Sequence, residues 1–448
     1  MTITKYSHAF LVGNLNGDSL RPECLDTNIW EKEIVSQEGA IKRYQNDHGY
    51  NGLCTLYYKA HVDAMLEADG VKRPVFLNSV HHYVHNLDQT NTESSSDNSI
   101  RLSLQKGKYP NLTTYEYIFK LCKLHLYFFP LKIILFAIEI DDSGTELDNL
   151  TAAHNSLVSY WDVDSFGNEK LLTLMRPLSE CLGKEAKKYT KDGNKLKIFQ
   201  TIKVGVSEIS NELLYELATS SPVGCVKEGN RPDLKPSENY FNKIISENSV
   251  STFDNWKGLA LMDSFTMLGK EDSFSEEDCI FLYFPLIYLR CIFEKTFCFS
   301  RNNNYREDKA KGNLSKEVAQ MEKYYFYDNI SYNFQPKLLY EAMAKGLGIK
   351  EEREVLSKQI KEKEEMNRNL LLGAVSVFAI FSVVYDFYSL IKAWSAKAFF
   401  DISESIIPVM NSIEQDSVEL PFFAFVLSII ALITTITVIW YLKSQRRR

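Results

Sequence analysis

Three histidines and an aspartate lie close together in SVHHYVHNLD, and they are the first side chains here that could bind a metal. They are His81, His82, His85 and Asp88. Two histidines three residues apart share one face of a helix, which makes His82 and His85 candidate zinc ligands. No cysteine or glutamate cluster stands at a spacing that completes such a site. The sequence therefore favours no bound metal.

Basic and aromatic side chains point to a second kind of chemistry, the binding of a nucleotide. Six lysines surround an Asp-Gly turn in residues 184–197 and would attract phosphate, although a solvated basic hairpin is the simpler interpretation. Arginine can donate two parallel hydrogen bonds to one phosphate group, and asparagine can hydrogen-bond to the edge of adenine. Arg301 and Arg306 in SRNNNYRED are therefore better ligand candidates. Trp161 and Trp256 are candidates for stacking on a base, with core packing as the alternative.

Motifs of the common enzyme classes are missing. The sequence has no G-x-S-x-G, H-E-x-x-H or G-x-G-x-x-G, and the nearest match to a phosphate-binding loop, GCVKEGNR, lacks the lysine and hydroxyl that hold phosphate and magnesium. No residue earns a catalytic role on this basis, and we expect a protein that is not an enzyme.

Two apolar stretches near the C-terminus predict transmembrane helices. The first begins at Asn369 with seventeen uncharged residues, meets Asp386 and continues apolar to Ile391. The second, Leu420–Leu442, has 23 uncharged residues, enough for about 30 Å of hydrocarbon. The apolar run at 279–298 contains charged residues, so a buried or interfacial helix is expected there instead of a third span. The N-terminal residues do not follow the pattern of a signal peptide.

Charge on either side of these stretches predicts their orientation. Lysines and arginines lie at 353–368 and 443–448, whereas the connecting segment 392–419 is acidic. The positive-inside rule therefore places both chain ends in the cytoplasm of a bacterial inner membrane and the acidic loop outside. Eight scattered cysteines without a C-x-x-C pair agree with a reducing compartment.

The residues ahead of the spans predict an α/β cytoplasmic domain at 1–275. Apolar runs at 100–105, 132–140, 198–209 and 256–269 suit strands, and the patterns at 30–45 and 112–128 suit helices. A helical region at 276–345 and a long stalk helix at 346–368 follow, with Gly346 and Gly348 as expected interruptions. Transmembrane helices at 369–391 and 420–442 flank the acidic outer loop, and a basic tail occupies 443–448.

The order of these parts resembles the CorA family of divalent-cation channels. Residues 324–381, YYFYDNISYNFQPKLLYEAMAKGLGIKEEREVLSKQIKEKEEMNRNLLLGAVSVFAIF, are similar to that family's stalk and first span: an aromatic-Asp segment, a heptad-like helix and asparagines at the membrane entry. The resemblance implies a CorA-like funnel, a homo-oligomer that is a pentamer in that family, with the first span around a central pore. The family has Gly-Met-Asn at the outer mouth, where this chain has Val409, Met410 and Asn411.

Taken with the large cytoplasmic part, the resemblance is strongest to the divergent CorA-like proteins of type III CRISPR systems. It implies a membrane effector of antiviral defence, opened by a nucleotide second messenger that is an adduct of S-adenosylmethionine and AMP. No tightly bound cofactor and no direct nucleic-acid binding are expected. The alternatives are a magnesium or other divalent-cation channel, and an enzyme that the spans merely anchor in the lipid bilayer.

Two stripes along the first span are candidate pore linings. A carboxylate in hydrocarbon costs about 2.5–3.5 kcal/mol, so Asp386 needs water, a partner or the headgroup layer, and apolar rings would form a dewetting gate. The candidates that we expect to line the pore are Asn367, Asn369, Gly373, Ser376, Val377, Ile380, Phe381 and Asp386. Acidic rings at the outer mouth would concentrate cations, and the candidates there are Met410, Asn411, Glu414, Asp416 and Glu419.

Overall fold

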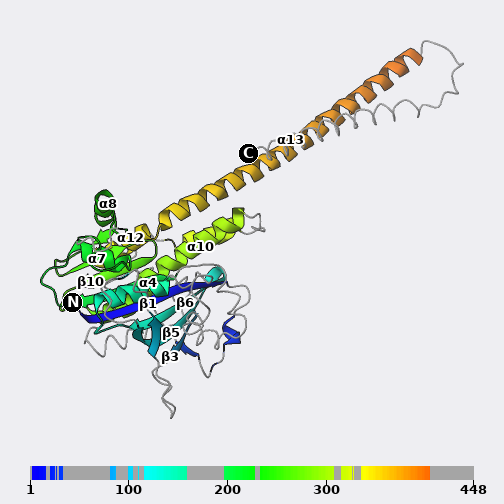
Figure 1. The fold of residues 1–448 in the computed structure, drawn as a ribbon. Helices are drawn as coiled ribbons and strands as arrows, with labels where there is room; N and C mark the ends of the chain where they lie inside the picture. Colours follow the sequence, from blue (N-terminus) through cyan, green and yellow to red (C-terminus); the bar gives the residue numbers. More distant parts are fainter. Residues whose placement is uncertain are drawn as a thin grey trace. The chain divides into compact units, whose positions relative to one another are not determined.

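The computed structural model describes residues 3–16, 21–25, 27, 30–33, 81–86, 99–103, 109, 116–158, 196–227, 233–306, 314–324, 326 and 334–403. The chain divides into two compact units, Met1–Gln359 and Ile360–Arg448. The first unit contains a sheet with helices, which confirms the expected α/β class (Figure 1).

The described strands form one sheet, in the order β2-β3-β5-β6-β1-β7-β10-β9-β8, with β4 also paired to β5. Neighbouring strands are antiparallel except β7 and β10, which are parallel. The strands are β1 (Thr4–Asn16), β2 (Glu31–Glu33), β3 (His81–Asn86), β4 (Ser99–Ser103), β5 (Glu116–Phe129), β6 (Ile133–Asp141), β7 (Lys197–Val204), β8 (Ser249–Val250), β9 (Trp256–Ala260) and β10 (Ser264–Gly269).

The helices follow in the same chain order. They are η1 (Pro22–Cys24), η2 (Pro130–Lys132), α4 (Leu147–Val158), α7 (Asn211–Ala218), α8 (Glu238–Asn248), α9 (Glu276–Asp278), η6 (Cys279–Tyr288), α10 (Leu289–Arg306), α11 (Leu314–Tyr324), α12 (Phe334–Gly346) and α13 (Ile349–Ser403).

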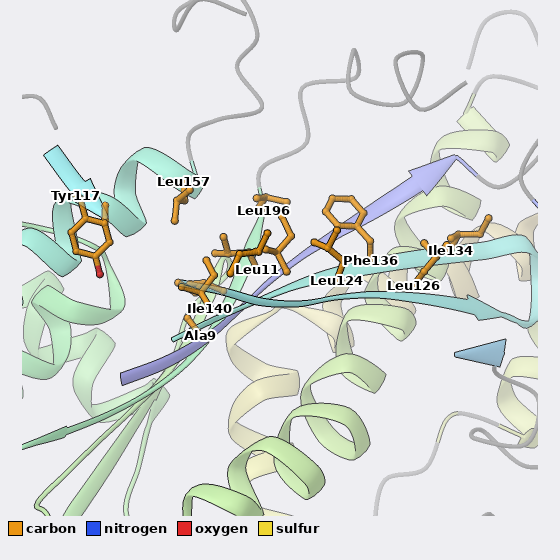
Figure 2. Packing of buried hydrophobic residues seen from close by; sticks show 14 of the residues in the cluster. Ala9, Leu11, Tyr117, Leu124, Leu126, Ile134, Phe136, Ile140, Leu157 and Leu196 are labelled. Atoms are coloured by element: carbon orange, nitrogen blue, oxygen red, sulfur yellow. The ribbon is translucent and has the colours of Figure 1, made fainter. Parts of the chain in front are cut away.

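One face of the sheet packs against α4 and is called the α4 face here. Because side chains alternate along a strand, Leu11 of β1, Leu124 of β5 and Phe136 of β6 point to this face, where they join Leu157 of α4 in one buried cluster. Figure 2 shows these side chains gathered between the strands and the helix. Burial of this apolar surface is the main contribution to the stability of the unit.

The opposite face packs against η6 and α10 and is called the α10 face. Phe10 of β1 stacks on Phe284 of η6, with ring centroids 3.7 Å apart, and Phe129 of β5 stacks on Phe293 of α10 at 4.6 Å. Residues Cys279–Tyr288 form a π-helix that contains Pro285, a residue that cannot donate the backbone hydrogen bond of a regular α-helix. The apolar run at 279–298 is therefore a buried helical layer of the first unit, in line with the sequence-based expectation.

The predicted strands at 100–105, 132–140 and 198–209 correspond to β4, β6 and β7, and the single strand expected at 256–269 is the hairpin of β9 and β10. The helix predicted at 112–128 is wrong, because β5 occupies Glu116–Phe129. Of the helix predicted at 30–45, only residues 30–33 are described, and Glu31–Glu33 is a strand.

Candidate functional site: helix α13 and the residues at its base

Helix α13 runs without interruption from Ile349 to Ser403, 55 residues in all (Figure 1). Its first turns are rich in charge, and its apolar part follows from Asn369. Among the described residues, it is the one helix long and apolar enough to cross a membrane, judged by length and composition, and none of its most apolar window is buried. The second predicted span, Leu420–Leu442, lies outside the described residues.

The base of α13 is held by side chains of the first unit. Leu356 is fully buried. Asn302 of α10 donates from Nδ2 to the backbone oxygen of Glu352 at 3.2 Å and to its Oε2 at 2.7 Å. The guanidinium of Arg353 lies 4.3 Å from the centroid of the Phe326 ring, within the range of a cation–π contact. These contacts connect the start of α13 to α10 and to Phe326.

A glycine-containing connection joins α12 to α13 and confirms the predicted interruption. A Cβ at Gly346 would lie 2.5 Å from the backbone oxygen of Ala260, so only glycine allows α12 to end this close to β9. Gly348 has φ of +68°, in the left-handed region that glycine enters without strain. The end of α12 is thus fixed on the sheet, and the chain changes direction before Ile349.

The candidate pore residues all lie on α13, but on more than one face. An α-helix turns about 100° per residue, which places four of the candidates within about 60° of one another: Asn369, Gly373, Ser376 and Ile380. Val377 and Phe381 lie about 90° from the middle of this group, and Asp386 lies about 110° away on its other side. Packing around a single axis would bring only one of these sets to that axis, so the list combines alternative linings and stays a prediction.

Two serine hydroxyls in the apolar half of α13 are satisfied within the helix. The hydroxyl of Ser376 donates to the backbone oxygen of Leu372 at 2.8 Å, and Ser389 donates to that of Asp386 at 2.8 Å. Such back-bonding keeps a serine compatible with hydrocarbon. The outer-mouth candidates Met410, Asn411, Glu414, Asp416 and Glu419 lie outside the described residues.

A fully buried ion pair ties α10 to α12 near the base of α13. Arg290 Nε donates to Glu294 Oε1 at 2.9 Å, one turn along α10. Tyr340 of α12 donates to Glu294 Oε2 at 3.3 Å, and the Arg290 guanidinium lies 5.1 Å from the Tyr340 ring centroid. Burial raises the pKa of Glu294, against the opposing charge of Arg290. The sequence contains these residues in an apolar run without indicating that they pair.

Of the ligand candidates, Trp256 and Arg301 have described side chains. Trp256 is 1% exposed, so its indole is packed in the core in this structure. Arg301 Nη2 donates to the backbone oxygen of Leu131 at 3.0 Å, and its Nε forms an ion pair with Glu317 at 2.6 Å. Leu131 has φ of +61°, which is unusual for leucine, so Arg301 holds a strained turn between β5 and β6. Trp161 and the side chain of Arg306 lie outside the described parts.

We expect Arg301→Ala to destabilise the first unit by about 1.5–3 kcal/mol, because it removes a charged hydrogen bond from a partly buried acceptor. Chemical denaturation of the purified full chain measures this. Lys337→Ala is the control, since its ion pair with Glu341 is exposed and 3.8 Å long and such pairs contribute little. Unchanged stability of Arg301→Ala together with a lost nucleotide response would instead return Arg301 to the ligand site.

The histidine segment at 81–86 is a strand, so the predicted helix face shared by His82 and His85 is wrong. His82 pairs with Tyr127, and His85 with Leu124, so the two histidines point to opposite faces of the sheet. Asp88 lies outside the described residues. Within the described ranges, no group of three histidine, cysteine, aspartate or glutamate residues could hold a metal ion.

On the α10 face, His82 instead begins a polar chain across four strands. His82 Nε2 lies 3.1 Å from His125 Nδ1, His125 Nε2 lies 2.8 Å from Glu139 Oε2, and His8 Nε2 lies 3.2 Å from Glu139 Oε1. All four residues are buried. The carboxylate can only accept, so we assign the proton of His125 to Nε2, which makes its Nδ1 the acceptor from His82.

Glu139 is ionised in this chain over a wide pH range. Burial opposes its ionisation, but the hydrogen bond from His125 and the proximity of His8 outweigh burial and hold the pKa of Glu139 well below its ordinary value. A carboxyl group whose pKa is lowered on folding stabilises the fold above its unfolded pKa, about 4.3. That stabilisation is lost as the pH falls through the folded pKa.

We therefore expect Glu139→Gln to destabilise the protein by about 1.5–3 kcal/mol at pH 7, the contribution typical of hydrogen bonds to a charged group. Below about pH 4.3 the difference from wild type should shrink progressively, because the unfolded wild-type chain takes up a proton that the folded carboxylate does not. Denaturation midpoints measured across pH test both points, with the exposed Glu247→Gln as control. A difference that stays constant down to pH 2 would contradict the role of the charge.

An Asp–His pair on the α4 face has the geometry of an acid–base pair but no access for a substrate. His154 Nε2 lies 2.8 Å from Asp142 Oδ2, and its Nδ1 lies 2.8 Å from Gln200 Oε1. Tyr117 donates to Asp142 Oδ1 at 2.9 Å. All four side chains are buried and hydrogen-bonded, as expected of a network that fixes the core.

Comparisons of this chain with protein-family models, with curated proteins and with solved structures found no match. The functional interpretation therefore depends on α13 and the residues around its base.

Proposed function

We propose that this chain is a ligand-gated, channel-like membrane effector of the CorA-like type, in which a nucleotide made in the cytoplasm opens a path across the bilayer. The observation that carries the proposal is the continuity of α13. One helix begins against buried residues of the sheet-containing unit and extends, without a break, through an apolar stretch long enough to span a membrane. A movement of its base is thereby transmitted to its apolar half.

The apolar half of α13 exposes large side chains on every side. Leu371, Phe378, Val383, Phe387 and Leu390 are each at least 64% exposed. A continuous apolar surface of this kind requires lipid or other protein to cover it. Two spans per chain cannot enclose a pore, so the proposal includes a homo-oligomer, a pentamer by the resemblance to CorA, with both ends of each chain on the cytoplasmic side.

The proposed activator is the adduct of S-adenosylmethionine and AMP, which the resemblance to type III CRISPR-associated members implies. An activator shifts the closed–open equilibrium only by as much as it binds the open state more tightly. Apolar side chains on α13 would close the resting pore by excluding water.

Ion flux from liposomes that carry the purified full chain tests this proposal. We expect flux only when the adduct is present, at any magnesium concentration. Flux that depends on magnesium and ignores the adduct would support a divalent-cation channel in its place. Unchanged biological activity after the sequence of 369–391 is scrambled, with its composition kept, would support a membrane-anchored enzyme.

A further inference from the structure

Lys295 of α10 carries a buried charge without a direct partner among the described residues. Among the residues described by the structure, its Nζ has neither a hydrogen-bond nor an ion-pair partner, although less than 1 Å² of that atom is exposed. Burial, and secondly the charge of Lys197, lowers the pKa of Lys295 to about 8. At neutral pH the ammonium group is therefore still mostly protonated. A buried charge without a partner is unfavourable, so this position would gain from a bound anion.

The charged groups around Lys295 come from three further elements. Lys197 lies at the start of β7 and is paired with Asp263, in the turn between β9 and β10. Glu351 and Glu352 lie in the first turn of α13. All four act on Lys295 electrostatically, but none of the three carboxylates is within ion-pair distance of its Nζ.

Each of those carboxylates is already engaged or solvated. Asp263 has Lys197 as its partner, Glu352 accepts from Asn302 at 2.7 Å, and Glu351 is exposed. A phosphate group bound to Lys295 would add negative charge near the two glutamates. Like charges repel, so the bound phosphate would push both glutamates away.

A second unsatisfied atom lies two helical turns further along α10. Asn302 is 2% exposed, and its Oδ1 has no partner among the described residues. In this structure its Nδ2 donates to two oxygen atoms of Glu352, which leaves Oδ1 as the acceptor that a ligand can reach. A ligand that offers an anionic oxygen to Lys295 and an N–H donor to Asn302 would satisfy both groups. A nucleotide has groups of both kinds.

We propose that Lys295, Lys197 and Asn302 bind the phosphate-bearing part of a nucleotide-like ligand, and that the bound phosphate displaces Glu351 and Glu352 at the base of α13. This inference rests on the proposed function, because it gives the activator a site and a mechanical consequence. The connection before α13 contains Gly348 at positive φ, which is a suitable place for the helix start to turn while Gly346 stays packed on β9. The bound state and the resting state then differ in whether an anion faces Lys295, which supplies the required difference in affinity.

Thermal unfolding of the purified full chain, with inorganic pyrophosphate as the probe and magnesium removed by chelation, tests the site without using flux. We expect a near-saturating concentration of pyrophosphate to raise the unfolding midpoint of the wild type by about 2–4 °C. Lys295→Met should abolish this shift, and Lys337→Met, which removes an exposed lysine, should retain it. Without pyrophosphate, Lys295→Met should be at least as stable as wild type, because an uncompensated charge is removed.

The pH dependence gives a second, independent readout. The pKa of Lys295 is lower in the folded state than in the unfolded chain, so between about pH 8 and pH 10.5 the unfolded state binds more protons. Wild-type stability should therefore rise with pH across this window relative to Lys295→Met. A constant difference between the two proteins would contradict the uncompensated charge.

The double variant Glu351→Gln and Glu352→Gln distinguishes a ligand site from a buried lysine that binds no ligand. The double variant should bind pyrophosphate several-fold more tightly, because the carboxylates that would repel it are gone.

Equal midpoint shifts in the wild type and Lys295→Met would overturn the site. If the adduct causes ion flux from liposomes but pyrophosphate does not shift the unfolding midpoint, the inference fails and the proposed function stands. If pyrophosphate binds through Lys295 but no condition produces flux, the site stands and the channel proposal fails.

Discussion

Glu364→Pro is expected to abolish adduct-dependent flux while leaving adduct binding intact. Glu364 is an exposed residue of α13, between the buried Leu356 and the apolar stretch that begins at Asn369. Proline in a helix interior removes a backbone hydrogen bond, clashes with the preceding turn and costs about 3 kcal/mol or more. A kink at this position would prevent a movement of the helix base from reaching the apolar half of α13.

Glu364→Ala is the matched control, because it removes the same charge and keeps a strong helix former. It should retain flux close to that of wild type. Binding is measured on the full chain by titration calorimetry with the adduct, and flux is measured on the same preparation in liposomes. If Glu364→Pro responds to the adduct as the wild type does, α13 does not carry the signal.

Glu294→Ala is expected to have the largest effect on stability, about 3–5 kcal/mol of unfolding free energy. The variant removes the carboxylate that pairs with the buried guanidinium of Arg290, at a position where the side chains of both residues are at most 2% exposed. It also removes the acceptor for the hydroxyl of Tyr340, so α10 and α12 lose their polar connection next to the base of α13.

The double variant Arg290→Met with Glu294→Leu separates charge from packing. Replacing a whole buried ion pair by apolar residues of similar size is often neutral or stabilising, so this variant should be far more stable than Glu294→Ala. Denaturant unfolding in detergent gives both values. A Glu294→Ala variant within about 1 kcal/mol of wild type would mean that water reaches Arg290.

The α/β class and the long apolar helix were predictable because they depend on local composition. A run such as 132–140 reads as a buried strand whatever surrounds it, and the glycines at 346 and 348 interrupt a helical pattern by their own backbone preferences. These features need no knowledge of which segments pair.

The strand β5 was mistaken for a helix for an identifiable reason. Both of its faces are buried, with Leu124 and Leu126 in the α4-face cluster and Tyr127 and Phe129 among the stacked rings of the α10 face. A strand covered on both sides loses the simple alternation that identifies it, and its apolar residues then also fit a helical spacing.

The side-chain clusters could not be predicted, because they depend on the register between strands. His125 meets Glu139 and His82 across separations of 14 and 43 residues, and the sequence contains no rule that aligns them. Lys197 was part of a basic segment for which a solvated hairpin was the preferred interpretation over phosphate binding, and its electrostatic interaction with Lys295 follows only from the fold. The candidate site at the base of α13 was therefore identified from the structure, whereas the apolar half of α13 was already predicted from the sequence.

Current through a planar bilayer that contains the purified chain tests the central claim most directly. The adduct is added first to one side and then to the other. We expect discrete current steps when the adduct reaches the side that carries the sheet-containing unit, and none when it reaches only the opposite side. A bilayer that stays silent with the adduct on both sides, or that conducts equally without it, would contradict the account.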